Sequence, residues 1–157
     1  MITGLKPRGF TWVIANRLAV SERIGGHGFQ HRRVRREEEI NWLVREGGIT
    51  SVVTLLAGNQ NLAAYEAAGL DTRTVPISSD PTRIDAKPLY DTLDELLADP
   101  ETRVLVHKEI IDDVVGGLLG GYLVASGLVK DQILASALIQ EILGRALGPE
   151  GRTLIRG

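Results

Sequence analysis

The sequence predicts an α/β domain of three layers, in which helices flank a mostly parallel central sheet. Short aliphatic and β-branched runs alternate along the chain with longer segments of helical periodicity, as in parallel sheets joined by crossover helices. The run 49–56 consists mainly of β-branched and aliphatic residues, as in a strand buried on both faces. The 157 residues suit a single core, so we expect one domain over residues 1–157.

The predicted strands are short and rich in Val, Ile, Leu and Thr. The first two flank the turn at Ala15 and Asn16, and the third follows the glycine pair that ends at Gly48. The expected strands cover residues 10–14, 17–20, 49–56, 72–77 and 103–107.

Glycine and proline set the limits of the predicted helices. Gly47 and Gly69 each end a helix, while Pro88 stands at the start of one that Pro100 terminates. The expected helices cover residues 35–46, 61–68, 88–98, 114–126 and 131–143. The segments 21–33, 78–86 and 108–113 are expected to be polar loops, and 144–157 a partly ordered tail.

Composition argues against several classes of protein. Twenty acidic and eighteen basic residues give a net charge of −2, whereas nucleic-acid-binding domains usually carry a basic excess. The absence of cysteine excludes disulfides, thiolate metal sites and a cysteine nucleophile. Residues 1–10 lack the apolar run of a signal peptide, and the uncharged stretch 114–129 is shorter than the roughly 20 residues of a membrane span. We therefore expect a cytoplasmic protein that binds neither nucleic acid nor membranes.

A series of short segments, in a defined order over about residues 10–154, resembles the dual-specificity and tyrosine phosphatases. The segments are 9–14, 17–19, 48–53, 69–70, 75–77 and 104–107, followed by Gly116 and Tyr122. The strongest is Val104 to His107, which stands where that family has its last strand before the active-site loop. The resemblance implies a cysteine-phosphatase-like fold.

The active-site motif of that family reads His-Cys-x-x-Gly-x-x-Arg-Ser/Thr and falls on residues 107–115. His107 is retained, but Lys108 stands at the position of the nucleophilic cysteine, Ile111 at that of the glycine and Val114 at that of the arginine. The family reaction needs a thiolate to attack phosphorus and a guanidinium to hold two phosphate oxygens. This loop supplies neither group.

Three carboxylates, Glu109, Asp112 and Asp113, add negative charge where the resemblance places a phosphate. We expect Asp112 and Asp113 to cap the helix that follows and to fill the former phosphate position as a built-in anion, with Lys108 as counter-ion. The sequence thus predicts a pseudophosphatase, a catalytically inactive phosphatase-like protein that acts by binding a partner protein or a small-molecule ligand.

The resemblance also places a general acid on the loop 78–86, where Asp80 is the better match and Asp85 the second. Both residues also suit structural positions, since Asp80 precedes Pro81 and Asp85 precedes a predicted helix. Without the nucleophile, we interpret both as turn residues.

Two other interpretations of the loop stay open. A desolvated and deprotonated Lys108 is a nucleophile or base, which would make the protein an enzyme with non-phosphatase chemistry assisted by Asp112 or Asp113. His107, Glu109 and the two aspartates are also possible metal ligands, as are His27 and His31, which lie four residues apart. We expect neither a metal nor a cofactor, and the sequence leaves the ligand and the oligomeric state open.

Two surface patterns have alternative interpretations. The basic run 31–36 is followed at once by Glu37 to Glu39, so it either binds an acidic segment or has its charge compensated within one helix. Trp12, Trp42 and the two phenylalanines have apolar neighbours, which favours packing in the core over a stacking platform.

Overall fold

The computed structural model describes residues 4–58 and 61–156. The chain groups into two compact units. Unit 1 comprises the described residues of Met1–Pro76 and Leu96–Ile110, and unit 2 those of Ile77–Glu95 and Ile111–Gly157. The interpretation of residues 1–157 as one domain stays a prediction.

Unit 1 is built on a five-stranded sheet with the order β1-β2-β5-β3-β4. The strands are β1 (Thr11–Ile14), β2 (Leu18–Ser21), β3 (Ser51–Thr54), β4 (Asp71–Thr74) and β5 (Val104–His107). Only β1 and β2 pair antiparallel; the pairs of β2 with β5, β5 with β3 and β3 with β4 are parallel. The register places Ser21, His107 and Thr54 side by side, at the carboxyl ends of three neighbouring strands.

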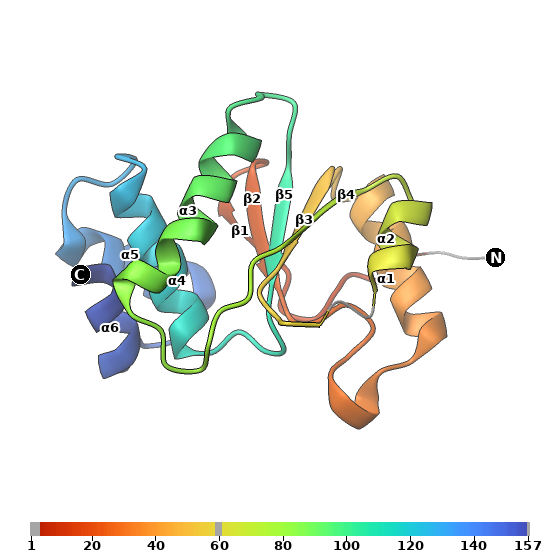
Figure 1. The fold of residues 1–157 in the computed structure, drawn as a ribbon, viewed down its shortest axis with the longest axis horizontal. Helices are drawn as coiled ribbons and strands as arrows, with labels where there is room; N and C mark the ends of the chain where they lie inside the picture. The colour runs from red at the N-terminus through yellow and green to blue at the C-terminus, as the bar shows by residue number, and fades with distance from the viewer. Residues whose placement is uncertain (1–3, 59–60, 157) are drawn as a thin grey trace. The chain divides into compact units, whose positions relative to one another are not determined.

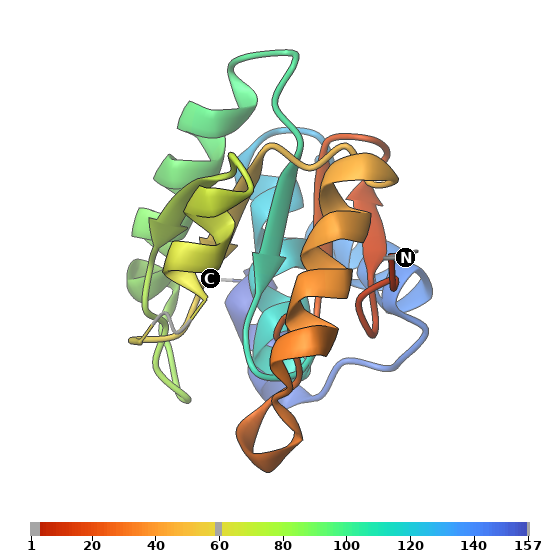
Figure 2. The same ribbon diagram turned by 90° about the vertical axis from the view of Figure 1, so that its right-hand side faces the viewer.

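Two helices, α1 (Arg33–Arg45) and α2 (Leu62–Ala67), lie on one face of this sheet (Figures 1 and 2). The buried cluster between them and the sheet is aliphatic, apart from Phe10 and Tyr65. It draws on both helices and on the three central strands, through Ile40, Leu43, Tyr65, Ala19, Val52 and Leu105. Unit 1 therefore has a core of its own on this face of the sheet.

The aromatic residues of unit 1 divide into two groups. Phe10 packs edge to face against Trp12 and Trp42, with ring centroids 5.3 and 4.9 Å apart, and this confirms the core role expected of these three. Phe29, in contrast, is 99% exposed in a short 3₁₀ turn. The expectation that both phenylalanines pack in the core is wrong for Phe29, because the polar, glycine-rich loop around it provides no apolar surface to cover the ring.

Unit 2 is helical. It contains α3 (Arg83–Leu97, whose last two residues are grouped with unit 1), α4 (Asp113–Ala125), α5 (Gln132–Leu143) and α6 (Pro149–Arg156). Among the described residues, no helix is both long and apolar enough to cross a membrane.

Helix α4 is buried from Val114 to Leu123, as the uncharged stretch in the sequence predicts. Its glycines allow neighbouring elements to approach closely. A Cβ on Gly117 would lie 2.6 Å from the Cα of Gly151 in α6, so at this crossing only glycine fits.

Helix α3 begins five residues before the predicted start. Thr82 and Asp85 form a capping box, in which the Thr82 N–H and hydroxyl donate to Asp85 Oδ2 at 2.7 and 3.0 Å. This box starts the helix at Arg83, and Pro88 consequently lies inside the helix instead of at its first position. The expected loop 78–86 is therefore too long.

The expected tail 144–157 is also wrong, since residues Pro149–Arg156 form α6. The glycine-rich sequence before α6 does not predict a helix or a strand. The start of α6 is stabilised by a side chain far away in the sequence, which belongs to the candidate site.

Candidate functional site

The residues that align with the phosphatase motif lie after β5 and at the start of α4. The chain passes from unit 1 to unit 2 between Ile110 and Ile111. Residues 107–110 are therefore positioned by the sheet of unit 1, and residues 111–114 by the helices of unit 2.

His107 is the last residue of β5 and is 2% exposed. Its Nδ1 lies 3.1 Å from the carbonyl oxygen of Lys108, and its Nε2 lies 2.9 Å from Thr54 Oγ1. Since a carbonyl oxygen only accepts, we assign the ring proton to Nδ1, and Nε2 then accepts from the Thr54 hydroxyl. Burial lowers the pKa of His107 to about 4, so the ring is neutral at neutral pH and holds the backbone of Lys108.

Glu109 is held by Arg23, a residue that the sequence did not single out. Arg23 Nη1 donates to Glu109 Oε1 at 2.8 Å, and the Arg23 backbone N–H donates to the Glu109 carbonyl oxygen at 3.2 Å. The Arg23 side chain is only 10% exposed. The pair borders a pocket of about 290 Å³ that is also lined by residues 56–58, which follow β3. The charge of Glu109 is thus compensated from within unit 1, and Lys108 beside it is half-buried.

Asp112 and Asp113 bind two different helices. Asp112 is the N-cap of α4, and its Oδ1 accepts from the Val115 N–H at 2.9 Å. Asp113, which the sequence also places at the start of this helix as a cap, instead receives hydrogen bonds from the start of α6. Its Oδ1 accepts from the Gly148 N–H at 2.5 Å and its Oδ2 from the Gly151 N–H at 2.7 Å. Both carboxylate oxygens of Asp113 therefore accept hydrogen bonds from the start of α6.

Val114, at the motif's arginine position, is 7% exposed and gives the start of α4 an apolar side chain. It lines a pocket of about 230 Å³ within unit 2, together with Asp80 and Glu150. The other lining residues are Pro81, Pro149, Thr153 and Leu154. The pocket thus carries two carboxylates and no basic side chain among these lining residues. The negative charge of these two carboxylates repels an anionic ligand.

The remaining candidate residues lie in separate places. Asp85 sits exposed in the capping box of α3, and the hydrogen bonds from the Thr82 backbone and then its hydroxyl lower the pKa of its carboxyl. Ile111 offers its carbonyl oxygen to Arg145 Nη1 at 2.8 Å. His31 Nε2 lies 3.3 Å from the side-chain oxygen of Asn61. Within residues 4–58 and 61–156, no three His, Asp or Glu side chains are grouped to hold a metal ion.

Comparison with known proteins gives a match in structure alone. No family model and no curated protein matches the chain. The crystal structure of Tk-PTP in its active form is 15% identical, covers 94% of this chain and 93% of its own, and superposes with a TM-score of 0.69. The core catalytic domain of the PP-IP phosphatase Siw14 from S. cerevisiae is 14% identical, with 98% and 87% coverage and a TM-score of 0.70. Kinase-associated phosphatase with serine in place of its catalytic cysteine is 16% identical, with 96% and 93% coverage and a TM-score of 0.69.

The chain has the cysteine-phosphatase fold. The resemblance to dual-specificity and tyrosine phosphatases is thereby confirmed at the level of the fold, and so is the α/β class with its mostly parallel central sheet. This example of the cysteine-phosphatase fold contains no cysteine. In the loop that the sequence analysis aligned with the motif, His107 is buried, and the carboxylates bind an arginine and two helix starts.

Proposed function

We propose that this protein is a catalytically inactive, phosphatase-like protein that acts by binding a partner protein or a ligand. The observation that carries the proposal is the internal use of the loop carboxylates. Glu109 pairs with Arg23, Asp112 caps α4, and Asp113 binds the start of α6. Side chains with these contacts stabilise the fold and are not arranged to bind a phosphate.

The chemistry of phosphoryl transfer supports the proposal. Attack on phosphorus by this fold requires a thiolate, and the sequence holds no cysteine. The negative charge that develops in the transition state requires a bidentate donor such as a guanidinium. Val114 stands at the aligned arginine position and has no side-chain donor.

Electrostatics in unit 2 supports it as well. A phosphate bound in the pocket beside Val114 would face the carboxylates of Asp80 and Glu150. Two unit charges 4 Å apart repel by about 4 kcal/mol at an effective dielectric constant near 20, and a dianion doubles that cost. The pocket therefore selects against the substrate of an active phosphatase.

Titration with phosphate and with tungstate, a tetrahedral dianion, tests the loss of oxyanion binding. Backbone amide shifts in two-dimensional ¹H–¹⁵N spectra follow residues 107–114 in the wild type, in Lys108→Ala and in Lys130→Ala, which removes an exposed lysine outside the motif. We expect no saturable shift of the loop in any of the three proteins. Saturable binding that Lys108→Ala abolishes and Lys130→Ala retains would show that the loop still holds an oxyanion, against the proposal.

A further inference from the structure

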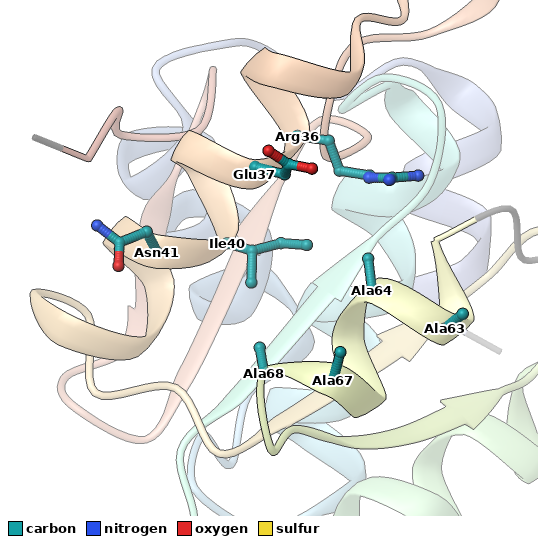
Figure 3. Close-up of a pocket in the computed structure, with 8 residues that line it drawn as sticks. All are labelled: Arg36, Glu37, Ile40, Asn41, Ala63, Ala64, Ala67 and Ala68. Atoms are coloured by element: carbon teal, nitrogen blue, oxygen red, sulfur yellow. The ribbon is translucent and has the colours of Figure 1, made fainter. Parts of the chain in front are cut away.

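An open groove runs between α1 and α2 in unit 1 (Figure 3), and its lining includes none of residues 107–114. Its volume of about 550 Å³ lies within the ~300–1,000 Å³ typical of small-molecule sites. Ile40 lines it from α1, and a row of alanines lines it from α2. The alanines are Ala63, Ala64, Ala67 and Ala68.

The alanines make the groove wide and leave it apolar. Ala64, Ala67 and Ala68 point toward α1 (Figure 3), and their methyl groups leave open the space that a larger side chain would fill. Ala67 and Ala68 are exposed to solvent. A ligand with an apolar body would therefore remove apolar surface from water on both helices.

Arg36 provides a positive charge at this groove. Its side chain extends from α1 above Ala64 (Figure 3). Its Nε is shielded from solvent and has no hydrogen-bond partner within the described part of the chain. A buried donor without an acceptor is destabilising, so binding free energy is gained when the Arg36 side chain turns this N–H toward a ligand oxygen.

The acidic residues next to Arg36 in the sequence are bound to other groups. These contacts are Glu37 with Arg33 at 3.1 Å, Glu38 with the Gly4 N–H at 2.8 Å, and Glu39 with Arg35 at 3.2 Å. Charge compensation within the helix therefore accounts for Arg33 and Arg35, whereas no carboxylate of the described residues forms an ion pair with Arg36. Arg36 also lies near the N-terminal end of α1, where the partial positive charge of the helix adds to its own.

We propose that this groove binds an organic anion that carries one carboxylate on a compact apolar body. The Arg36 side chain turns its guanidinium toward the carboxylate, which accepts its hydrogen bonds, and the apolar body covers Ile40 and the alanines. A single charge fits because Glu37 lines the same groove, so a second anionic group would face a carboxylate. The inference names the ligand class for the binding role proposed above and rests on that role.

The test uses 4-phenylbutyrate. The comparison compounds are 4-phenylbutanamide, which is uncharged, and acetate, an anion without a large apolar group. Amide shifts of the ¹⁵N-labelled full chain report affinity and position in one experiment. We expect phenylbutyrate to shift residues 36–41 and 63–68 saturably. We expect the amide and acetate to bind at least about tenfold more weakly, because each lacks one of the two interactions.

Matched variants separate the charge from the shape of the groove. Arg36→Gln should weaken phenylbutyrate binding at least about tenfold, while Arg45→Gln, on an exposed arginine of the same helix, should leave it unchanged. Ala67→Leu should abolish binding by filling the groove, and its spectrum shows independently that the chain is folded.

Three results would overturn the inference: equal binding of the acid and the amide, unchanged binding by Arg36→Gln, or shifts that are absent or map outside α1 and α2. The same spectra report on residues 107–114 when phosphate or tungstate is added. A groove that does not bind the ligand is therefore distinguished from a loop that does bind an oxyanion, which would contradict the proposed function.

Discussion

Removing the carboxylate of Asp113 should loosen α6. Each of its two hydrogen bonds, to the N–H groups of Gly148 and Gly151, joins a charged acceptor to a donor at a helix start. Hydrogen bonds to charged groups contribute roughly 1.5–3 kcal/mol each, and loss of a helix cap costs roughly 0.5–2 kcal/mol. Asp113 is half-buried, so water replaces part of the lost contact. We therefore expect Asp113→Ala to cost about 2–4 kcal/mol of unfolding free energy.

Asp113→Asn keeps one acceptor oxygen, so its cost should be about half as large, roughly 1–2 kcal/mol. For a chain of this length, each kcal/mol lowers Tm by about 2–4 °C. Urea and thermal unfolding followed by circular dichroism measure these differences. Hydrogen exchange of residues 149–156 locates them, because protection should fall first in α6.

Asp80→Ala provides the control, since it removes an exposed aspartate of the same unit and should change stability by less than about 0.5 kcal/mol. The reasoning is refuted if Asp113→Ala matches Asp80→Ala in stability, or if it leaves the exchange rates of α6 unchanged.

Three further predictions concern His107, the glycines and Lys108. The pKa of His107 is about 4 in the folded chain and 6.5 in the unfolded chain, so its contribution to the unfolding free energy is complete above pH 6.5 and is lost as the pH falls toward 4. About 3 kcal/mol of unfolding free energy should disappear over this range. His107→Asn should flatten the dependence of the unfolding free energy on pH in acid unfolding curves. Gly117→Ala should cost about 1–3 kcal/mol in urea unfolding because its Cβ would press on Gly151. Gly58→Ala, whose added Cβ would meet no atom of the described residues within 4 Å, should cost less than about 0.5 kcal/mol. Borohydride treatment with a panel of carbonyl compounds should leave the mass of Lys108 peptides unchanged, and a reduced adduct there would favour Schiff-base chemistry.

The elements that the sequence predicted well are those with a strong local pattern. The apolar run Val104 to Val106 forms β5 together with His107, and the uncharged stretch after Val114 forms the buried helix α4. Helix α6 escaped prediction because its start depends on Asp113, more than 30 residues earlier in the chain. The start of α3 was missed for a different reason: Pro88 suggested a helix start, although the capping box at Thr82 precedes it.

The candidate site, too, could be predicted only in part from the sequence. The motif alignment located residues 107–114, and Asp112 suited a helix cap by position alone. The pairing of Arg23 with Glu109 joins residues 86 positions apart, so no spacing rule reveals it. Arg36 was visible as part of a basic run, but the sequence does not show which arginine of that run has a buried N–H without an acceptor.

Hydrolysis of p-nitrophenyl phosphate by the purified protein between pH 5 and 8, beside Lys108→Ala, tests the loss of catalysis most directly. We predict no turnover above that of the variant at any pH, because neither a thiolate nor a loop guanidinium is present. Turnover by the wild type that Lys108→Ala abolishes would contradict this account and would establish a cysteine-free reaction centred on Lys108.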